Sequence, residues 1–416
     1  MTERPLLITA AVVAPMDRPI IREAGVLVAA GRVIALGPLS EIQRSLPPHE
    51  ELHLGHAVLL PGLINAHVHL ELSGCDSSDS PGGGSFTDWI MSLPSRTRRL
   101  QPDYAERLAV AVDAGAKQCL RYGVTAVGDI TAQPTLTRPL LRHGPLRTLS
   151  FGEVLGLAKA RERFEKGIEP AIDGQMAGDF LRIGLSPHAP YTVDLPGYTQ
   201  CVNLARQSQL PLATHLAETS EETAFLRDHS GPFREIWDRL GTWHDDVTTY
   251  DGGPVAFARS VGLLDVPAIL AHVNYADDDD LSMLAAGRAS VAFCPRTHAY
   301  FGHPPHRWRE MLERGINVAV GTDSCASSPD LNLVDDLRLL WRKHGHAAES
   351  DALWALATTN AAEALQWSGR LGSITPGKLA DLTAFSFIGD VDPLGAVLED
   401  DTALPIATWV GGKRIS

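Results

Sequence analysis

The sequence has few cysteines and no long apolar run. Its five cysteines are scattered and odd in number, and no C-x-x-C pair occurs, so neither a disulfide framework nor a cysteine-based zinc module is expected. No apolar stretch approaches the ~20 residues of a membrane-spanning helix. The first residues also lack the basic and apolar regions of a signal peptide. We therefore expect reduced thiols, a cytoplasmic location and no membrane partner.

Basic residues are also in the minority. The 36 Lys and Arg residues are outnumbered by 50 Asp and Glu residues, which gives a formal net charge of −14 at pH 7. This balance disfavours nucleic acid as a partner, because nucleic-acid-binding proteins usually present an excess of positive charge. The one basic cluster, residues 96–99, is short, and we expect it to form a solvated loop.

Several catalytic signatures are missing as well. H-E-x-x-H, G-x-x-x-x-G-K-[ST] and G-x-S-x-G do not occur, which argues against zincin proteases, P-loop enzymes and α/β-hydrolases. His69-Leu70-Glu71 matches the first half of the H-x-E…P-C-x-x-C signature of one type of zinc deaminase, but the second half is absent. Any chemistry must therefore rest on a different arrangement of side chains.

The pattern that is present is α/β. From residue 59 onward, apolar runs of strand length alternate with helical segments, which is typical of βα units around a parallel sheet. Eight such strands predict a closed (β/α)8 TIM-type barrel. An open doubly wound sheet is the alternative, but it would need a glycine-rich turn after its first strand, and residues 70–73 are not one. The expected strands are residues 63–69, 124–129, 148–155, 181–186, 212–216, 268–273, 290–294 and 317–321.

Both ends of the chain have a different, antiparallel β pattern, in which short apolar runs alternate with turns. We expect these ends to build one small β-sandwich domain together. The predicted division is residues 1–58 for the N-terminal part of the sandwich, residues 59–371 for a metal-dependent barrel, and residues 372–416 for the C-terminal part of the sandwich.

Metal-compatible side chains stand at the ends of four predicted strands. His67 and His69 end the first strand, and residues two apart on a strand point to the same face. His215 ends the fifth strand, His272 the sixth and Asp323 the eighth. One histidine at a strand end is readily explained as structural. Five metal-compatible side chains at the rim where barrels place their active sites predict a divalent-metal site.

Glu218 lies three residues beyond His215 and is a candidate general acid. The alternative is a carboxylate that stabilises the start of a helix. Residues 219–222, Thr-Ser-Glu-Glu, predict a capping box that opens the next helix. The acidic run at residues 277–280 predicts another helix start, and we assign it no metal role.

Three motifs resemble the amidohydrolase superfamily, in its cytosine-deaminase-like branch. They are Pro-Gly-Leu-Ile-Asn-Ala-His-Val-His at residues 61–69, His-Leu-Ala-Glu at 215–218 and Gly-Thr-Asp-Ser at 321–324. That branch includes guanine, S-adenosylhomocysteine/methylthioadenosine and aminofutalosine deaminases and the triazine chlorohydrolases. The resemblance covers nearly the whole chain and implies a hydrolase acting on C–N bonds other than peptide bonds.

The resemblance and the side-chain chemistry together imply one bound divalent ion. Zn²⁺ is the expected ion and Fe²⁺ the alternative, with one position left for water, whose pKa the ion lowers. Asp323 would also accept the water proton, and His272 would orient the water or polarise the leaving centre. Glu218 would protonate a ring nitrogen and then pass a proton to departing ammonia. The expected metal ligands are His67, His69, His215 and Asp323.

A second ion is the open alternative. Relatives with two metals bridge them with a carboxylated Lys or a Glu near the third or fourth strand, and only Glu153 fits that position here. We predict one ion, because deamination needs a single hydroxide and an acid. Whether Glu153 supports a second ion stays open.

Four residues are candidate substrate contacts. His188 and Trp89 match residues that contact the substrate in the resembling branch, although core packing explains Trp89 equally well. Glu71, directly after the first strand, would accept a hydrogen bond from a ribose hydroxyl. Arg296 offers a planar, bidentate donor for a carboxylate or ring carbonyl. Residues 294–298, Cys-Pro-Arg-Thr-His, differ from the Cys-Pro-x-Ser-Asn of many relatives. This difference puts in doubt that the chain acts on the same substrates as those relatives.

The resulting prediction is a metal-dependent hydrolytic deaminase of an aminated N-heterocycle, either a purine base or a nucleoside, with an aminofutalosine-like nucleoside as one candidate. Metal-bound hydroxide would attack the ring and ammonia would be released. One alternative is a hydrolase of a cyclic amide or of a C–Cl or C–N bond in a triazine-like ring. Another is a non-catalytic barrel with a role in assembly. The expected partner is a small heterocyclic substrate, and a homo-oligomer is compatible with the sequence.

Overall fold

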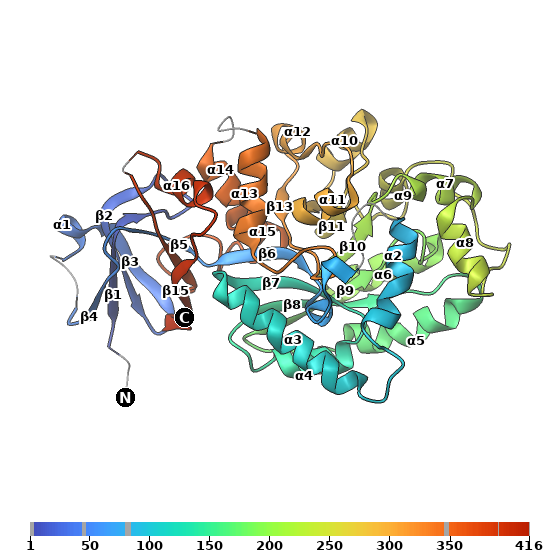
Figure 1. Cartoon of the computed structure of the whole chain (residues 1–416), viewed down its shortest axis with the longest axis horizontal. Helices are drawn as coiled ribbons and strands as arrows, with labels where there is room; N and C mark the ends of the chain where they lie inside the picture. Colours follow the sequence, from blue (N-terminus) through green and yellow to red (C-terminus); the bar gives the residue numbers. More distant parts are fainter. Residues whose placement is uncertain (1–3, 44–46, 80–84, 345–348, 390, 416) are drawn as a thin grey trace.

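The computed structural model describes residues 4–43, 47–79, 85–344, 349–389 and 391–415, and these residues contain two eight-stranded sheets. One sheet is parallel, and its strands follow one another in chain order (Figure 1). These are the eight predicted strands, with ends shifted by up to two residues. Their bounds are β6 (Leu63–Val68), β7 (Val124–Thr131), β8 (Arg147–Val154), β9 (Leu181–Pro187), β10 (Leu212–Leu216), β11 (Ala268–His272), β12 (Ser290–Phe293) and β13 (Val318–Val320).

Burial explains the continuous apolar runs of this sheet. Every residue of β6, β7 and β10 is buried, because helices surround the strands (Figure 1). A strand that is covered on both faces is apolar along its length, whereas a strand with one exposed face alternates apolar and polar residues.

The parallel sheet curls until its first and last strands meet. Val68 and Asp323 form an isolated parallel bridge, and the Asp323 N–H donates to the His67 carbonyl at 3.1 Å. This contact lies at the carboxyl ends of β6 and β13, where the predicted metal ligands stand. The predicted (β/α)8 barrel is therefore confirmed.

The helices of the described residues lie mainly around this barrel, and none of them is long and apolar enough to cross a membrane. Their bounds are α1 (Leu39–Ile42), α2 (Phe86–Arg96), α3 (Tyr104–Arg121), α4 (Pro134–Leu141), α5 (Arg161–Ile172), α6 (Leu195–Ser208), α7 (Glu221–Asp228), α8 (Pro232–Arg239), α9 (Pro254–Ser260), α10 (Asp278–Ala285), α11 (Pro295–Phe301), α12 (Trp308–Glu313), α13 (Leu333–His344), α14 (Ser350–Leu356), α15 (Thr359–Ala364) and α16 (Pro393–Glu399).

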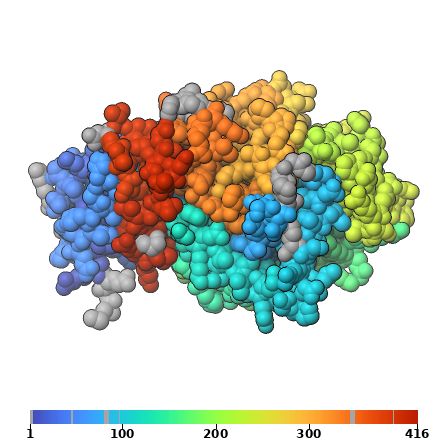
Figure 2. Space-filling model, in the orientation of Figure 1, coloured from blue at the N-terminus to red at the C-terminus, as the bar shows by residue number. Residues whose placement is uncertain are grey.

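The second sheet is mixed and combines both ends of the chain, as predicted. Figure 2 shows these segments, blue and red, together at one end of the molecule. The two ends join where β5 pairs antiparallel with β14, and a buried ion pair between Arg147 and Asp381 (2.7 Å) ties this sheet to the barrel. Its strands are β1 (Leu6–Val13), β2 (Ile21–Ala29), β3 (Arg32–Pro38), β4 (Glu50–His53), β5 (Ala57–Pro61), β14 (Leu382–Ser386), β15 (Pro405–Val410) and β16 (Lys413–Arg414).

Two predicted helix starts turn out differently. At α10 the side chains of Asp277 and Asp280 form a reciprocal capping box, so the acidic run stabilises a helix start as predicted. At α7 the capping box is only half formed. The Glu222 carboxylate accepts the Thr219 N–H at 3.2 Å, but the buried Thr219 hydroxyl has no hydrogen-bond partner among the described residues.

Candidate active site

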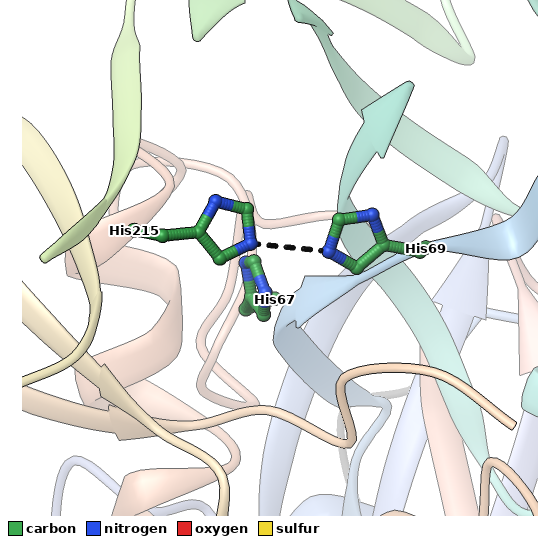
Figure 3. Close-up of side chains that lie close together, drawn as sticks. All are labelled: His67, His69 and His215. Atoms are coloured by element: carbon green, nitrogen blue, oxygen red, sulfur yellow. Dashed lines mark hydrogen bonds between the residues drawn. The ribbon is translucent and has the colours of Figure 1, made fainter. Parts of the chain in front are cut away.

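Three imidazoles and one carboxylate converge at the carboxyl rim of the barrel. His67 belongs to β6, His69 follows it, His215 belongs to β10, and Asp323 follows β13. The three histidine rings face one another, with centroids 5.0–5.3 Å apart (Figure 3). Asp323 Oδ1 lies 3.6 Å from His69 Nε2 and 3.9 Å from His67 Nε2. The structure thus brings the four predicted ligands together.

Hydrogen bonds and burial leave these histidines with free lone pairs. His215 Nδ1 lies 3.2 Å from the His188 carbonyl, so it carries the proton and Nε2 does not. Neither ring nitrogen of His67 has a hydrogen-bond partner among the described residues, and both are buried. Burial first, and then the neighbouring histidines, hold the pKa of His67 and of His69 well below the usual range. Burial also lowers the pKa of His215 to about 4. Neutral imidazole is the form that binds metal.

The spacing of these atoms fits a metal ion. His69 Nε2 and His215 Nε2 are 3.2 Å apart (Figure 3). Ligands about 2.0–2.1 Å from one ion, in a tetrahedron, lie about 3.3 Å from each other. The donor set of three imidazole nitrogens and one carboxylate oxygen suits Zn²⁺ and Fe²⁺. A divalent ion bound here would account for one of the two unpartnered ring nitrogens of His67.

Neighbouring side chains hold the ligands in place. The Asn65 side-chain oxygen accepts the N–H groups of His67 (3.3 Å) and Thr322 (3.2 Å), and its amide donates to the Thr322 hydroxyl at 2.7 Å. Ser327 donates to Asp323 Oδ2 at 3.2 Å. Asn65 thus links the first and last barrel strands beside the ligands. Sequence reasoning missed this role, although a polar residue inside an apolar strand was a signal for it.

Glu218 and His272 lie beside Asp323, one of the predicted metal ligands. Their side chains are 5 % and 2 % exposed, and Glu218 Oε1 lies 3.5 Å from His272 Nε2. Together with Asp323 they form a group whose ligand atoms lie within 4.8 Å of one another. Burial, with the charges of Asp323 and Glu222, raises the pKa of Glu218 well above its ordinary value. Glu218 can therefore keep a proton where an ordinary glutamate would have lost it.

A cavity of about 480 Å³ reaches the predicted metal ligands at His69, which is one of its lining residues. Glu71 and His188, two of the predicted substrate contacts, both line this cavity. Glu71 accepts hydrogen bonds from the Thr131 hydroxyl (2.8 Å) and the Ala132 N–H (3.3 Å), and burial raises its pKa to about 7. His188 Nδ1 lies 2.7 Å from the Thr192 hydroxyl, so its other nitrogen is left for a ligand.

The structure does not bring the other two predicted contacts to this cavity. The Arg296 guanidinium is bound to the carboxylates of Asp330 (2.7 Å) and Asp336 (3.0 Å), and Arg296 is not among the lining residues. These two carboxylates give Arg296 a role in fixing the segment that follows β12 rather than in contacting a ligand. Trp89 is also absent from the lining. Its indole N–H donates to the Ala326 carbonyl at 3.1 Å, so packing accounts for its position.

Two arginines that sequence reasoning did not select occupy the outer part of the cavity. Arg99 and Arg163 both line it, and neither guanidinium has a hydrogen-bond or ion-pair partner within the described parts of the chain. Residues 97–99, predicted as part of a solvated loop, form a turn, and Arg99 also lines the cavity, which the sequence did not indicate. Nothing in the local sequence marks Arg163, which lies on the helical segment α5.

One further group of ligand atoms overlaps the first. Atoms of Glu153, His188 and His215 lie within 4.8 Å of one another. However, His215 Nδ1 is engaged with the His188 carbonyl, and its Nε2 faces His69. A second ion would have to compete for that same nitrogen, which favours a single ion.

Known proteins resemble this chain in fold and in sequence. A model of the amidohydrolase family matches residues 58–415. The chain belongs to the amidohydrolase family. The predicted family and the predicted class, a hydrolase of C–N bonds, are thereby confirmed. Amidohydrolases typically depend on a divalent metal ion, in agreement with the convergent histidines and carboxylate.

Relatives within this amidohydrolase family cover most of the chain. It is 31 % identical to the 5-methylthioadenosine/S-adenosylhomocysteine deaminase of Desulfovibrio desulfuricans, over 91 % of this chain and 83 % of that protein. It is 30 % identical to the aminodeoxyfutalosine deaminase of Deinococcus radiodurans, over 75 % and 74 % of the two chains. Among solved structures, the aminofutalosine deaminase of Helicobacter pylori in complex with methylthio-coformycin is 25 % identical, with a TM-score of 0.84 over 99 % and 100 % of the two chains.

Proposed function

We propose that this amidohydrolase is a metal-dependent hydrolytic deaminase of a purine nucleoside that carries an anionic substituent. The similar proteins named above act as deaminases on 5-methylthioadenosine, S-adenosylhomocysteine and aminodeoxyfutalosine. The observation that carries the proposal is the layout of one cavity. His69 of the metal-fitting cluster lines this cavity, and so do Arg99 and Arg163, which have no hydrogen-bond or ion-pair partner among the described residues.

The proposed ion is a single divalent cation, with Zn²⁺ expected and Fe²⁺ the alternative. When bound, such an ion supplies Lewis acidity that lowers the pKa of a water molecule toward ~7. This is supported by the neutral, buried imidazoles and by the spacing of their Nε2 atoms. The expected ligands are His67, His69, His215 and Asp323.

The chain's own residues would then move protons around the reacting carbon. Glu218, in its acid form, would donate a proton to the ring nitrogen next to that carbon. Asp323 would take the proton of the attacking water, and His272, 3.5 Å from Glu218, would orient the incoming oxygen. A C–O bond forms between the water oxygen and the ring carbon, and the C–N bond to the amino group breaks. The amino group would leave as ammonia with the proton that Asp323 took from water. The ring nitrogen would keep the proton from Glu218, and the new hydroxyl would return a proton to Glu218 as it becomes a carbonyl.

The rest of the cavity would select the substrate. Glu71 would accept a hydrogen bond from a sugar hydroxyl, and His188 would contact the sugar or base through its free nitrogen. Arg99 and Arg163 would bind a carboxylate on the sugar's substituent, because guanidinium groups pair with carboxylates in a bidentate way. A volume of about 480 Å³ is within the usual range for small-molecule sites.

An ammonia-release assay tests the proposal. The metal-loaded protein would be incubated with S-adenosylhomocysteine, aminodeoxyfutalosine, 5-methylthioadenosine, adenosine and guanine, and with an uncharged chlorotriazine. We expect ammonia release with the highest kcat/KM on the two carboxylate-bearing nucleosides. Absence of ammonia from every purine would contradict the proposal. Chloride release from the triazine would instead favour the triazine-hydrolase alternative.

A further inference from the structure

A buried carboxylate that the proposed reaction does not use lies against the Glu218 loop. Glu222, in the first turn of α7, is 1 % exposed. Its Oε2 accepts the Ala217 N–H at 2.9 Å, and its Oε1 accepts the N–H groups of Glu218 at 2.6 Å and Thr219 at 3.2 Å. A single side chain thus binds three consecutive peptide groups.

The loop needs such a partner because it leaves the sheet at this point. Strand β10 ends at Leu216, and Ala217 adopts a left-handed backbone conformation with φ of 49°, which non-glycine residues rarely adopt. The next N–H groups no longer have a neighbouring strand to bind, and buried N–H groups without an acceptor are strongly disfavoured. The Glu222 carboxylate takes the place of that strand.

The loop that follows strand β11 also binds residues 217 and 218. The Asn274 side-chain amide donates to the Glu218 carbonyl at 3.0 Å, and the Tyr275 N–H donates to the Ala217 carbonyl at 3.1 Å. Both peptide groups of Glu218 are therefore bound, its N–H by Glu222 and its C=O by Asn274. Only its side chain is left to face His272.

We propose that Glu222 is a positioning residue for Glu218, which fixes the backbone of residues 217–219 so that the Glu218 carboxyl meets the substrate ring. This inference rests on the proposed function, in which Glu218 is the proton donor. A carboxylate suits the task because it offers two acceptor oxygens and no donor. A glutamine would keep one acceptor oxygen but turn an N–H group toward at least one of the peptide N–H groups.

Kinetics of Glu222→Ala and Glu222→Gln test the role, with Glu221→Ala as the matched control. Glu221 is the preceding residue in the same helical turn, and it is exposed. Because a misplacement of about 1 Å can cost roughly 10²-fold in rate, we expect kcat to fall roughly 10²-fold in Glu222→Ala and about 10-fold in Glu222→Gln. KM and the metal content per chain should stay close to wild type, and Glu221→Ala should match wild type throughout. An unchanged kcat in Glu222→Ala, or a fall that follows loss of metal, would overturn the proposal.

Amide hydrogen exchange in the metal-loaded protein gives a second readout that needs no substrate. Exchange over residues 217–219 should be faster in Glu222→Ala than in wild type and unchanged in Glu221→Ala. Unchanged exchange in Glu222→Ala would also overturn the inference. If Glu222→Ala does not fold, kcat and amide exchange are both measured on Glu222→Gln, which preserves the side-chain volume. A wild-type protein that deaminates no nucleoside would overturn the proposed function, whereas the exchange result would still show whether Glu222 holds the loop.

Discussion

The inner and outer ends of the cavity are built in different ways. The inner end meets the predicted metal ligands at His69, which directly follows strand β6 and whose pKa is lowered first by burial. The outer end carries Arg99 and Arg163, which lie on a turn and on the helical segment α5 and remain unpaired within the described parts of the chain. Under the proposed function, strand ends would provide fixed geometry for bond breaking, and the connecting segments would provide charge for substrate recognition.

The largest effect should come from removing a ligand at the inner end. His215→Ala takes away one of the two facing Nε2 atoms, so we expect loss of bound metal and a fall in kcat on the order of 10⁴-fold or more, because water is then no longer activated. Metal analysis and ammonia release would measure both. His244→Ala, at an exposed histidine, is the control. Retention of a full equivalent of metal in His215→Ala would contradict the assigned ligand set.

The next effect separates proton transfer from metal binding. Glu218→Gln keeps the shape of the side chain but removes the acid, so we expect kcat to fall roughly 10²–10⁴-fold with metal content unchanged. Glu221→Gln, at the exposed neighbouring carboxylate, should leave both quantities at wild-type values. A Glu218→Gln variant with full activity would mean that another group donates the proton.

A smaller and selective effect is expected at the outer end. Arg163→Met removes a cation while keeping an apolar stem, so KM for a carboxylate-bearing nucleoside should rise roughly 10-fold, as expected for a lost charged hydrogen bond, with kcat little changed. KM for adenosine, which has no carboxylate, should stay the same. Lys166→Met is the matched control, because Lys166 on the same helix is already paired with Glu162 at 2.6 Å. An equal rise for both substrates would place the anion-binding role elsewhere.

The smallest effect concerns pH. Burial raises the pKa of Glu218 well above the ordinary 4.5, so its acid form persists above that pH and is lost only as pH rises through the raised value. We therefore expect kcat/KM to hold well above pH 4.5 and to fall on the alkaline side, in wild type and in Arg163→Met alike. A profile that already falls near pH 4.5 would contradict the role of Glu218 as an acid. A profile shifted only in Arg163→Met would show that the two ends are not independent.

Most of the inner end could be predicted from the sequence. His67 and His69 share a face because a strand repeats every two residues, and His215 and Asp323 join them because parallel strands present their carboxyl ends at one rim. Glu71 and His188 were found by the same reasoning, since each stands at or just beyond a strand end.

The outer end could not be predicted in this way. Arg296 stands beyond a strand end, as the other candidates do, but its guanidinium is bound to Asp330 and Asp336, which lie over thirty residues away in the chain. Arg99 looked like part of a solvated loop, yet that segment folds back over the cavity. Glu222 looked like half of a capping box, although it also accepts two further N–H groups from the loop before the helix. In each case a partner distant in space decided the role.

The sequence by itself determined the barrel and the metal-fitting cluster, because strand periodicity and the order of βα units are local properties that fix which residues reach the rim. Its motifs at residues 61–69, 215–218 and 321–324 carried the resemblance to the family. Only the tertiary structure decided which cations face the cavity and which carboxylate holds the Glu218 loop. Those roles depend on the direction that connecting segments take after they leave the sheet, and that direction is set by packing and by buried hydrogen bonds between distant parts of the chain.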